Sequence, residues 1–169
     1  KVADAASTPE KPRFVAGSMG PTTKTISVTG GITFEELTDG YQIQAAGLIE
    51  GGADLLLLET GQDTLNIKAG LEGIDRAFAE LGREIPVAVQ GTVEPMGTLL
   101  AGQDVEALYA TADILVCPSR HEPLGNVIIE GWAHGIPVVA AKNLGPAALI
   151  KNEETGILFP VDDVTALAS

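Results

Sequence analysis

Two glutamates separated by seven residues mark the stretch with the clearest chemical pattern. Glu122 stands in a loop after an apolar run, and Glu130 follows about two helical turns later. Between them, Leu124-Gly125-Asn126 is where we expect a helix to begin. The N–H groups of a first helical turn have no partners within the helix and carry the positive end of its dipole, so they suit a phosphate. Gly125 would let such a group approach the backbone closely.

The residues around this loop predict one β-α-β unit. The apolar run at 114–117 predicts a strand, the helix follows it, and the run IPVVAA at 136–141 predicts the next strand. The spacing lets Glu130 face along the helix toward the loop. Alternatively, Glu122 caps the helix and Glu130 is a solvated surface charge, and on spacing alone this second interpretation is favoured.

A second group of polar residues follows three earlier apolar runs, at 13–17, 54–59 and 85–92, which predict strands. Loops at the carboxyl ends of parallel strands carry the sites of α/β folds, so these residues are candidates for binding. Structural roles are the alternative: a mobile connection at 18–24, and a helix cap at Asp63 or Thr64. The strand-tip candidates are Lys24, Glu59, Thr60, Asp63 and the pair Gly91-Thr92.

Strands alternate with helical patterns along the whole chain. Thr33-Phe34-Glu35-Glu36 is a capping box, and apolar residues follow it at three- and four-residue steps until Gly51-Gly52. A similar apolar face runs from Ile67 to Leu81 and ends at Gly82. Six strands with helical crossovers predict an α/β fold with a doubly wound, Rossmann-like open parallel sheet.

Composition excludes several classes of function. The net charge of −13 argues against affinity for nucleic acid or anionic membranes, and no apolar run is long enough to span a bilayer. We therefore expect a soluble, cytoplasmic chain. Cys117 is the only cysteine, which excludes internal disulfides and cysteine-rich zinc sites, and its place at a strand end predicts a core residue. His121 and His134 have too few further ligands nearby for a metal site, and we expect no cofactor.

From about Asp104 onward, the chain resembles the donor-binding domain of retaining glycosyltransferases with two Rossmann domains. The resemblance rests on DVEALYATADILVCPSR, HEPLGNVIIEGWAHGIPVVAA, GPAALI and TGILFPVDD. It implies that Glu130 binds a nucleotide ribose and that Glu122 lies beside the donor sugar. It also implies that the diphosphate is bound by the N–H groups of Gly125, Asn126 and Val127. The basic residues of the family's first strand are replaced here, so Lys24 or Arg120 would have to substitute for them.

From about Pro12 to Gln103, the chain resembles the homocysteine-binding barrel of cobalamin-dependent methionine synthase, over its second to fourth βα units. The matching stretches are RFVAGSMGPTTK, ITFEELTDGYQIQAAGLIEGGADLLLLETGQDTLNIKAGL and PVAVQGTVEPMGTLLAGQ. In that family a zinc ion held by three cysteines activates the substrate thiol. With one cysteine in this chain, we expect no methyl transfer and carry over only the strand-tip residues.

The two resemblances meet near Gln103-Asp104 without a linker, which favours an engineered chimera. We expect a single hybrid domain of residues 1–169, with a barrel-derived half at 1–103 and a glycosyltransferase-derived half at 104–169. By resemblance to the glycosyltransferase domain, the strand order would be 3-2-1-4-5-6. The strand centres would then be Val15, Leu57, Val89, Val116, Val139 and Leu158.

Three functions remain open from the sequence. The leading hypothesis is an engineered chimeric α/β scaffold without autonomous catalytic activity, needing no partner. The alternative is residual binding of a nucleoside diphosphate or nucleotide sugar at the helix start after Glu122. An intact methyltransferase or glycosyltransferase is the third, and the incomplete sites argue against it. An exposed edge at the third strand would also leave open self-association through that edge.

Overall fold

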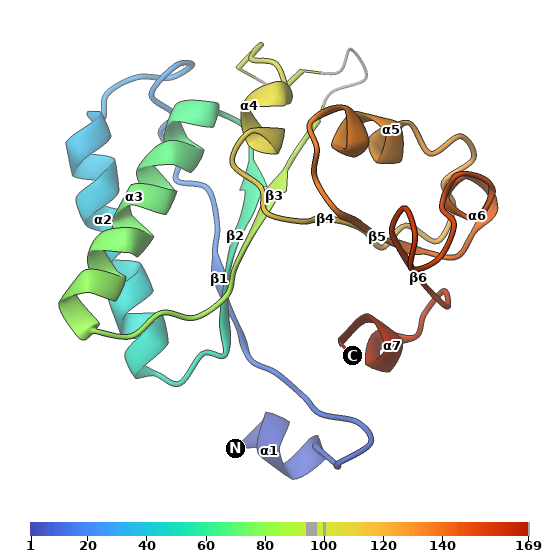
Figure 1. Cartoon of the computed structure of the whole chain (residues 1–169). Helices are drawn as coiled ribbons and strands as arrows, with labels where there is room; N and C mark the ends of the chain where they lie inside the picture. Colours follow the sequence, from blue (N-terminus) through green and yellow to red (C-terminus); the bar gives the residue numbers. More distant parts are fainter. Residues whose placement is uncertain (94–97, 100, 169) are drawn as a thin grey trace. The chain divides into compact units, whose positions relative to one another are not determined.

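The structure is a computed structural model that describes residues 1–93, 98–99 and 101–168 (Figure 1). The chain divides into two compact units. The first unit holds residues 1–8 and 12–105, and the second holds residues 9–11 together with the chain from Glu106 onward. The loop predicted from Val93 to Gly102 lies partly outside the described residues, which omit 94–97 and 100.

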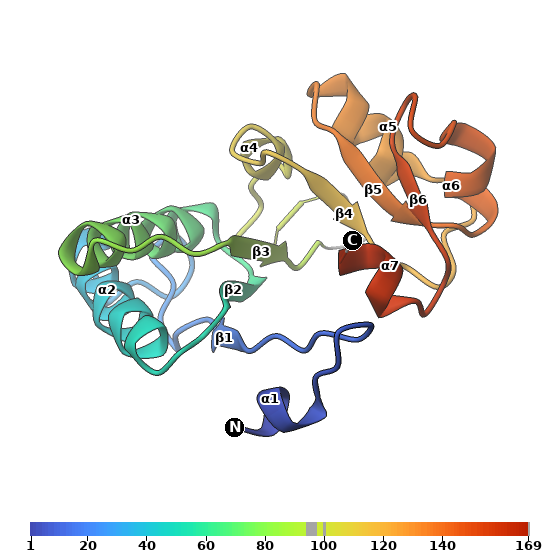
Figure 2. The same ribbon diagram turned by 60° about the horizontal axis from the view of Figure 1, so that its bottom comes forward.

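The first unit contains a parallel three-stranded sheet in the order β1-β2-β3. Helices α2 and α3 lie side by side along one face of this sheet (Figures 1 and 2). The elements of this unit are α1 (Val2–Ala6), β1 (Ala16–Met19), α2 (Phe34–Glu50), β2 (Leu55–Gly61), α3 (Thr64–Leu81) and β3 (Val87–Gly91).

The core of the first unit lies between the sheet and its two helices. Leu56 and Leu58 alternate along β2 with half-buried residues and are 0% and 2% exposed, so one face of the strand is fully covered. The capping box at Thr33 starts α2 as predicted, with the Thr33 hydroxyl accepting from the Glu36 amide at 3.2 Å. Asp63 caps α3, and Gly82 ends it in the left-handed conformation.

Gly73 sets how closely the two helices of the first unit approach. A methyl group placed there would lie 2.6 Å from the carbonyl oxygen of Thr38 and 2.8 Å from the amide nitrogen of Gln42, both on α2. The α3 backbone therefore packs directly against α2, at a spacing that only a residue without a side chain allows.

The second unit has its own parallel sheet, in the order β4-β5-β6. Its core is formed by Cys117, Ile128, Val138, Ala140 and Ile150. Cys117 is 5% exposed, which confirms the prediction of a core residue. The elements of this unit are α4 (Glu106–Tyr109), β4 (Leu115–Cys117), α5 (Asn126–Ala133), β5 (Val138–Ala141), α6 (Leu144–Leu149), β6 (Ile157–Phe159) and α7 (Val164–Ala168).

The predicted α/β class with parallel strands is confirmed, whereas the order 3-2-1-4-5-6 is wrong at one pairing. Its two halves match the observed orders, but β1 and β4 belong to separate sheets. The resemblance, and not the residue pattern, supplied the pairing of the first strand with the fourth.

The first strand also lies further along the chain than predicted. Its ladder runs from Ala16 to Met19, so the expected centre, Val15, precedes it. The Val15 amide donates to the side chain of Asp54 at 2.7 Å, and its carbonyl accepts from the Asp54 amide at 2.8 Å. These two hydrogen bonds take the place of strand pairing at that position.

None of the helices in the described residues is long and apolar enough to cross a membrane.

Candidate functional site

The start of α5 is built around Gly125, the residue that precedes the helix. Its φ of 75° is in the left-handed region, and a side chain there would come within 2.8 Å of Leu149. Its carbonyl accepts from the amides of Ile128 and Ile129, at 3.0 and 3.4 Å. Glycine is thus required both by the backbone conformation and by the packing of α6 against this turn.

The carboxylate of Glu122 is bonded to the same turn. Its Oε1 accepts from the Gly125 amide at 3.0 Å, and its carbonyl oxygen accepts from the Gly145 amide at 2.8 Å. The bond engages the amide of Gly125, the residue before the first turn, and no side chain caps the amides of the first turn itself. One of the three amides expected to bind a diphosphate is therefore engaged by an acidic side chain of the chain itself.

The next two amides at this helix start remain open. In the part of the chain that the structure describes, no hydrogen bond is formed by the amides of Asn126 and Val127. They occupy the first turn of α5, where a helix has no internal acceptors and its dipole is positive. An anionic group could bind there without breaking an existing backbone bond.

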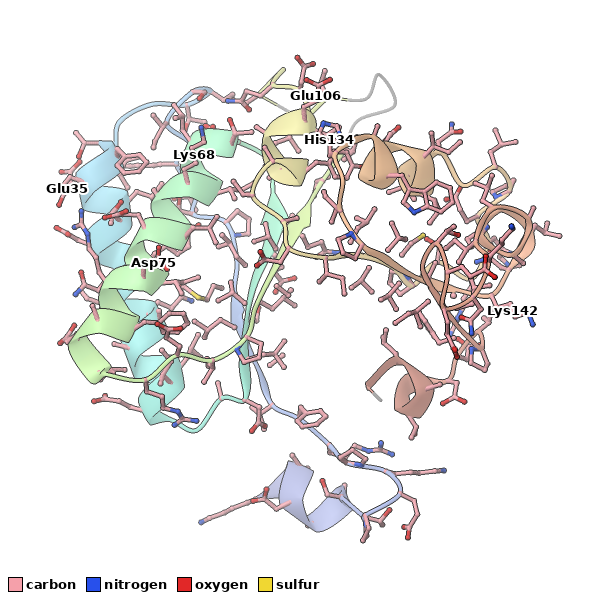
Figure 3. The ribbon with its side chains drawn as sticks, in the orientation of Figure 1. Glu35, Lys68, Asp75, Glu106, His134 and Lys142 are labelled. Atoms are coloured by element: carbon pink, nitrogen blue, oxygen red, sulfur yellow. The ribbon has the colours of Figure 1, made fainter. Side chains whose placement is uncertain are left out.

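The side chain of Glu130 contacts the preceding helix. Its Oε2 accepts a hydrogen bond of 2.8 Å from the hydroxyl of Tyr109 on α4. Burial raises the pKa of Tyr109, and the hydrogen bond to Glu130 and the charge of that carboxylate raise it further. The ring of Tyr109 stacks on the ring of His134, with 5.0 Å between the ring centroids. His134 lies at the end of α5 (Figure 3).

The basic residues expected near the diphosphate are used elsewhere. Arg120 forms an ion pair with Asp162, with 2.7 Å between Nε and Oδ1. Lys24 belongs to the first unit, and its Nζ donates to the carbonyl of Gly31 at 2.8 Å, which closes the loop that contains it.

The strand-tip residues of the first unit form internal hydrogen bonds. Glu59 accepts from the hydroxyl of Ser18 on the neighbouring strand. Thr60 has a φ of 56°, an uncommon conformation for a β-branched residue, at an irregularity in the register between β2 and β3. The Thr92 amide donates to the Gly61 carbonyl at 2.8 Å, which continues the pairing beyond Gly91.

Asp63 is the most enclosed of these residues, with 0% exposure. Its oxygens accept from the Ser27 amide and hydroxyl, the Leu65 amide and the Gln103 side chain, at 2.8 to 3.0 Å. Burial alone would raise the pKa of Asp63, but these bonds outweigh it and hold the pKa below its ordinary value. Asp63 thus joins the loop before α2 and the segment after β3 to the start of α3.

Tyr109, Ser27 and Gln103 were not identified from the sequence. Tyr109 lies 21 residues from Glu130, and Gln103 lies 40 residues from Asp63. Neither separation corresponds to a helical or strand period, so no pattern in the sequence pairs these residues.

Two protein-family models match the chain. The model described as Homocysteine S-methyltransferase matches residues 1–120, and the model described as Glycosyl transferases group 1 matches residues 94–169. The matches overlap over residues 94–120, which include the predicted seam. They confirm the predicted combination of two families in one chain.

Two curated relatives are methionine synthases from mycobacteria. That of Mycobacterium leprae is 44% identical over 115 residues, which are 68% of this chain and 10% of the relative. The methionine synthase of Mycobacterium tuberculosis is 41% identical over 115 residues, which are again 68% of this chain and 10% of the relative. The chain therefore spans about a tenth of the length of these relatives.

Three similar solved structures each cover more than nine tenths of this chain. Anabaena HepE in complex with UDP has a TM-score of 0.42 and 24% identity, over 92% of this chain and 37% of that one. Sucrose-phosphate synthase from Thermosynechococcus elongatus has a TM-score of 0.42 and 26% identity, over 95% of this chain and 35% of that one. The apo form of the homocysteine methyltransferase MmuM from Escherichia coli has a TM-score of 0.47 and 16% identity, over 93% of this chain and 62% of that one.

Proposed function

The chain belongs to the homocysteine S-methyltransferase family, whose model matches residues 1–120, and we propose that its 169 residues form an engineered chimeric α/β scaffold without catalytic activity of their own. The chain combines segments of a methyltransferase family and a glycosyltransferase family. The overlap of the two matches over residues 94–120 supports an engineered join, because two unrelated segments meet there without a spacer.

One observation carries the proposal on the methyltransferase side. The chemistry implied by the resemblance needs three thiolates around a zinc ion, and these 169 residues contain one cysteine. That cysteine, Cys117, is 5% exposed in the core of the second unit. Without a thiolate-bound metal, nothing in this stretch lowers the pKa of a substrate thiol.

On the glycosyltransferase side, the acidic residues are bonded within the chain. Glu122 is bonded to the Gly125 amide, and Glu130 to the Tyr109 hydroxyl. The nearby Arg120 is paired with Asp162. A donor would have to displace these contacts before its leaving diphosphate could be neutralised by Arg120.

The experiment uses the whole chain with each family's substrates. The chain, at roughly 50 to 100 µM, would be incubated in one reaction with homocysteine, zinc and a methyl donor, and in a separate reaction with nucleotide sugars. The products of both reactions would be measured by mass spectrometry. We expect neither methionine nor free sugar above the rate without protein. Turnover that scales with chain concentration and survives repurification would overturn the proposal.

A second candidate function is weak binding of a nucleoside diphosphate at the start of α5. It is favoured by the two amides of Asn126 and Val127, which form no hydrogen bond in the described part of the chain and lie in the first turn of α5. Calorimetric titration with UDP, ADP, GDP and pyrophosphate tests it. Absence of heat at millimolar ligand would remove this function and leave the scaffold proposal intact.

Variants separate the expected parts of this site. Glu130→Ala should weaken nucleosides more than pyrophosphate, because the expected partner of Glu130 is the ribose. Asp113→Asn is a control, since Asp113 is an exposed acid of the same unit outside the turn. Equal losses for nucleosides and pyrophosphate would contradict the role of Glu130, while unchanged binding in both variants would show that the amides act without it.

A further inference from the structure

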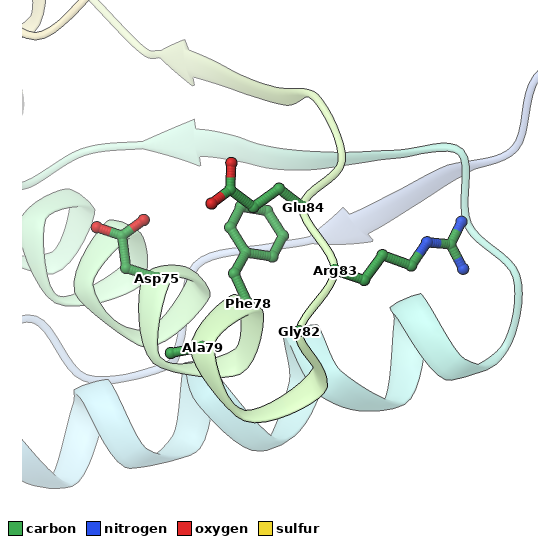
Figure 4. A pocket seen from close by; sticks show the side chains of 6 residues that line it. All are labelled: Asp75, Phe78, Ala79, Gly82, Arg83 and Glu84. Carbon is green, nitrogen blue, oxygen red and sulfur yellow. The ribbon is translucent and has the colours of Figure 1, made fainter.

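The outer edge of β3 has no neighbouring strand in the sheet of the first unit. Figure 4 shows the chain passing from the end of α3 through Arg83 and Glu84 into β3, which lies on one side of β2. Among the strands of the described chain that lie at a sheet edge, which are β1, β3, β4 and β6, β3 is the longest, with five residues. An edge strand presents unpaired N–H and C=O groups that another strand can pair.

A hydrogen bond to β2 shows which residues of β3 face outward. The Pro86 carbonyl accepts from the Leu56 amide at 2.9 Å, so the backbone groups of Pro86 face β2. Successive residues of a strand direct these groups to opposite sides, so those of Val87 and Val89 face away from β2. Proline has no N–H group, but since it faces β2 it removes no donor from the outer edge.

The side chains along this edge are apolar and partly exposed. In the register of the sheet, Val87 lies beside Leu56, and Val89 lies beside Leu58. The two leucines are 0% and 2% exposed, whereas the two valines are 36% and 40% exposed. No charged residue occurs from 85 to 93. In a chain with a net charge of −13, this edge can therefore meet a second copy without bringing acidic side chains together.

We propose that β3 pairs with β3 of a second copy of this chain, in antiparallel orientation about a twofold axis at Ala88. Identical strands related by such an axis form a closed dimer, because the same surface is used on both copies. In this register Val87 of one copy lies opposite Val89 of the second copy. The outward N–H and C=O groups of these valines then match in about four hydrogen bonds, and their side chains pair on one face of the joined sheet.

The dimer should be weak and sensitive to salt. A pairing of five-residue strands is at the small end of protein interfaces, where complexes are transient. The net charge of −13 on each copy opposes association, and salt screens this repulsion. Association should therefore be stronger at about 500 mM NaCl than at about 20 mM.

Sedimentation equilibrium of the whole chain measures the association. Over a range from about 20 µM to about 1 mM, we expect the average mass to rise from that of one chain toward that of two chains, and to rise further at high salt. The mass of a single chain at every concentration would overturn the proposal.

Disulfide trapping tests which surface associates. Ala88→Cys would place two thiols directly opposite each other at the axis, with about 4.5 Å between the Cα atoms, a separation that a disulfide spans. Gln90→Cys is the matched control, because Gln90 is a more exposed residue of the same strand but would lie about 14 Å from its own copy. The native Cys117 is 5% exposed, which leaves the introduced cysteine as the accessible thiol.

Under mild oxidation, Ala88→Cys should form linked dimers about tenfold faster than Gln90→Cys, with circular dichroism confirming that both variants are folded. A mixture of Val87→Cys and Val89→Cys chains is a second test, and it should form mixed dimers faster than either homodimer. Equal rates for Ala88→Cys and Gln90→Cys, or no excess of mixed dimers, would overturn the proposal. The result is independent of whether a nucleotide binds at α5.

Discussion

Replacing Gly73 by alanine should destabilise the first unit, because the new methyl group has no space between the helices. It would lie 2.6 Å from the Thr38 carbonyl oxygen, 2.8 Å from the Gln42 nitrogen and 2.9 Å from the Tyr41 side chain. Two of these neighbours are backbone atoms of α2, so relief requires the helices to move apart. Overpacking of a core costs about 1–3 kcal/mol, and contact with backbone places this case at the upper end.

Alanine also gains helix propensity relative to glycine, about 1 kcal/mol. The expected net loss in the free energy of unfolding is therefore about 2 kcal/mol. Gly40→Ala is the matched control, since Gly40 is an exposed glycine in the interior of α2 and a methyl group there would meet no neighbouring atom within 4 Å. This variant should gain about 1 kcal/mol.

Urea unfolding followed by far-ultraviolet circular dichroism measures both variants, because α2 and α3 are the two longest helices of the described chain. The two variants should differ by about 3 kcal/mol at an unchanged slope. If Gly73→Ala is as stable as the parent chain, the close approach of α2 and α3 is incorrect. If Gly40→Ala is destabilised to the same extent, the loss cannot be assigned to the contact between helices.

Three further predictions concern the polar contacts. Tyr109→Phe removes the hydroxyl that donates to Glu130 and should cost about 1 kcal/mol of stability in thermal unfolding; an unchanged midpoint would show that the bond contributes nothing. Asp63→Asn should be destabilised by about 1–3 kcal/mol at pH 7. Because the pKa of Asp63 is lower in the folded state, its carboxylate stabilises the fold above the unfolded-state pKa of about 4. This stabilisation is lost as the pH falls below that pKa, so the stability of the variant should approach that of the parent chain in acid. A constant difference in stability from pH 7 to pH 2 would refute the charge of Asp63 as its cause. Glu122→Gln removes a negative charge beside the Gly125 amide and should strengthen pyrophosphate binding by about fivefold in calorimetry, whereas weaker binding would mean that the carboxylate helps to hold the anion.

The local features of the fold could be predicted because they depend on neighbouring residues. The capping box at Thr33, the cap at Asp63 and the stop at Gly82 each follow from residues within one helical turn. The core position of Cys117 followed from its place at the end of an apolar run. These features need no knowledge of which strands pair.

Non-local contacts could not be predicted in the same way. The bond from Tyr109 to Glu130 and the bonds from Gln103 to Asp63 join segments that are brought together by the fold of each unit. The pairing of the first strand with the fourth was taken from a family resemblance, and it failed because β1 and β4 belong to separate sheets. Residue patterns indicate which face of a strand is buried but not its neighbour in the sheet.

At the candidate site, the sequence located the right turn but left the role of its acids open. Glu122 and Gly125 do meet, through a hydrogen bond of 3.0 Å between the Gly125 amide and the Glu122 carboxylate. Spacing alone could not reveal that Glu130 would be bonded to Tyr109 on a different helix. The prediction of a single hybrid domain stays a prediction, and one cooperative unfolding transition would support it where two separate transitions would contradict it.

The most direct test of the central claim is one NMR experiment on the intact chain with UDP-glucose at about ten millimolar, recorded over days. Protein amide signals and the anomeric proton of the sugar are followed in the same sample. We predict that the sugar signal decays no faster than in the protein-free control, with any shifts confined to the start of α5 at Asn126 and Val127. Release of free glucose in proportion to chain concentration would contradict the claim.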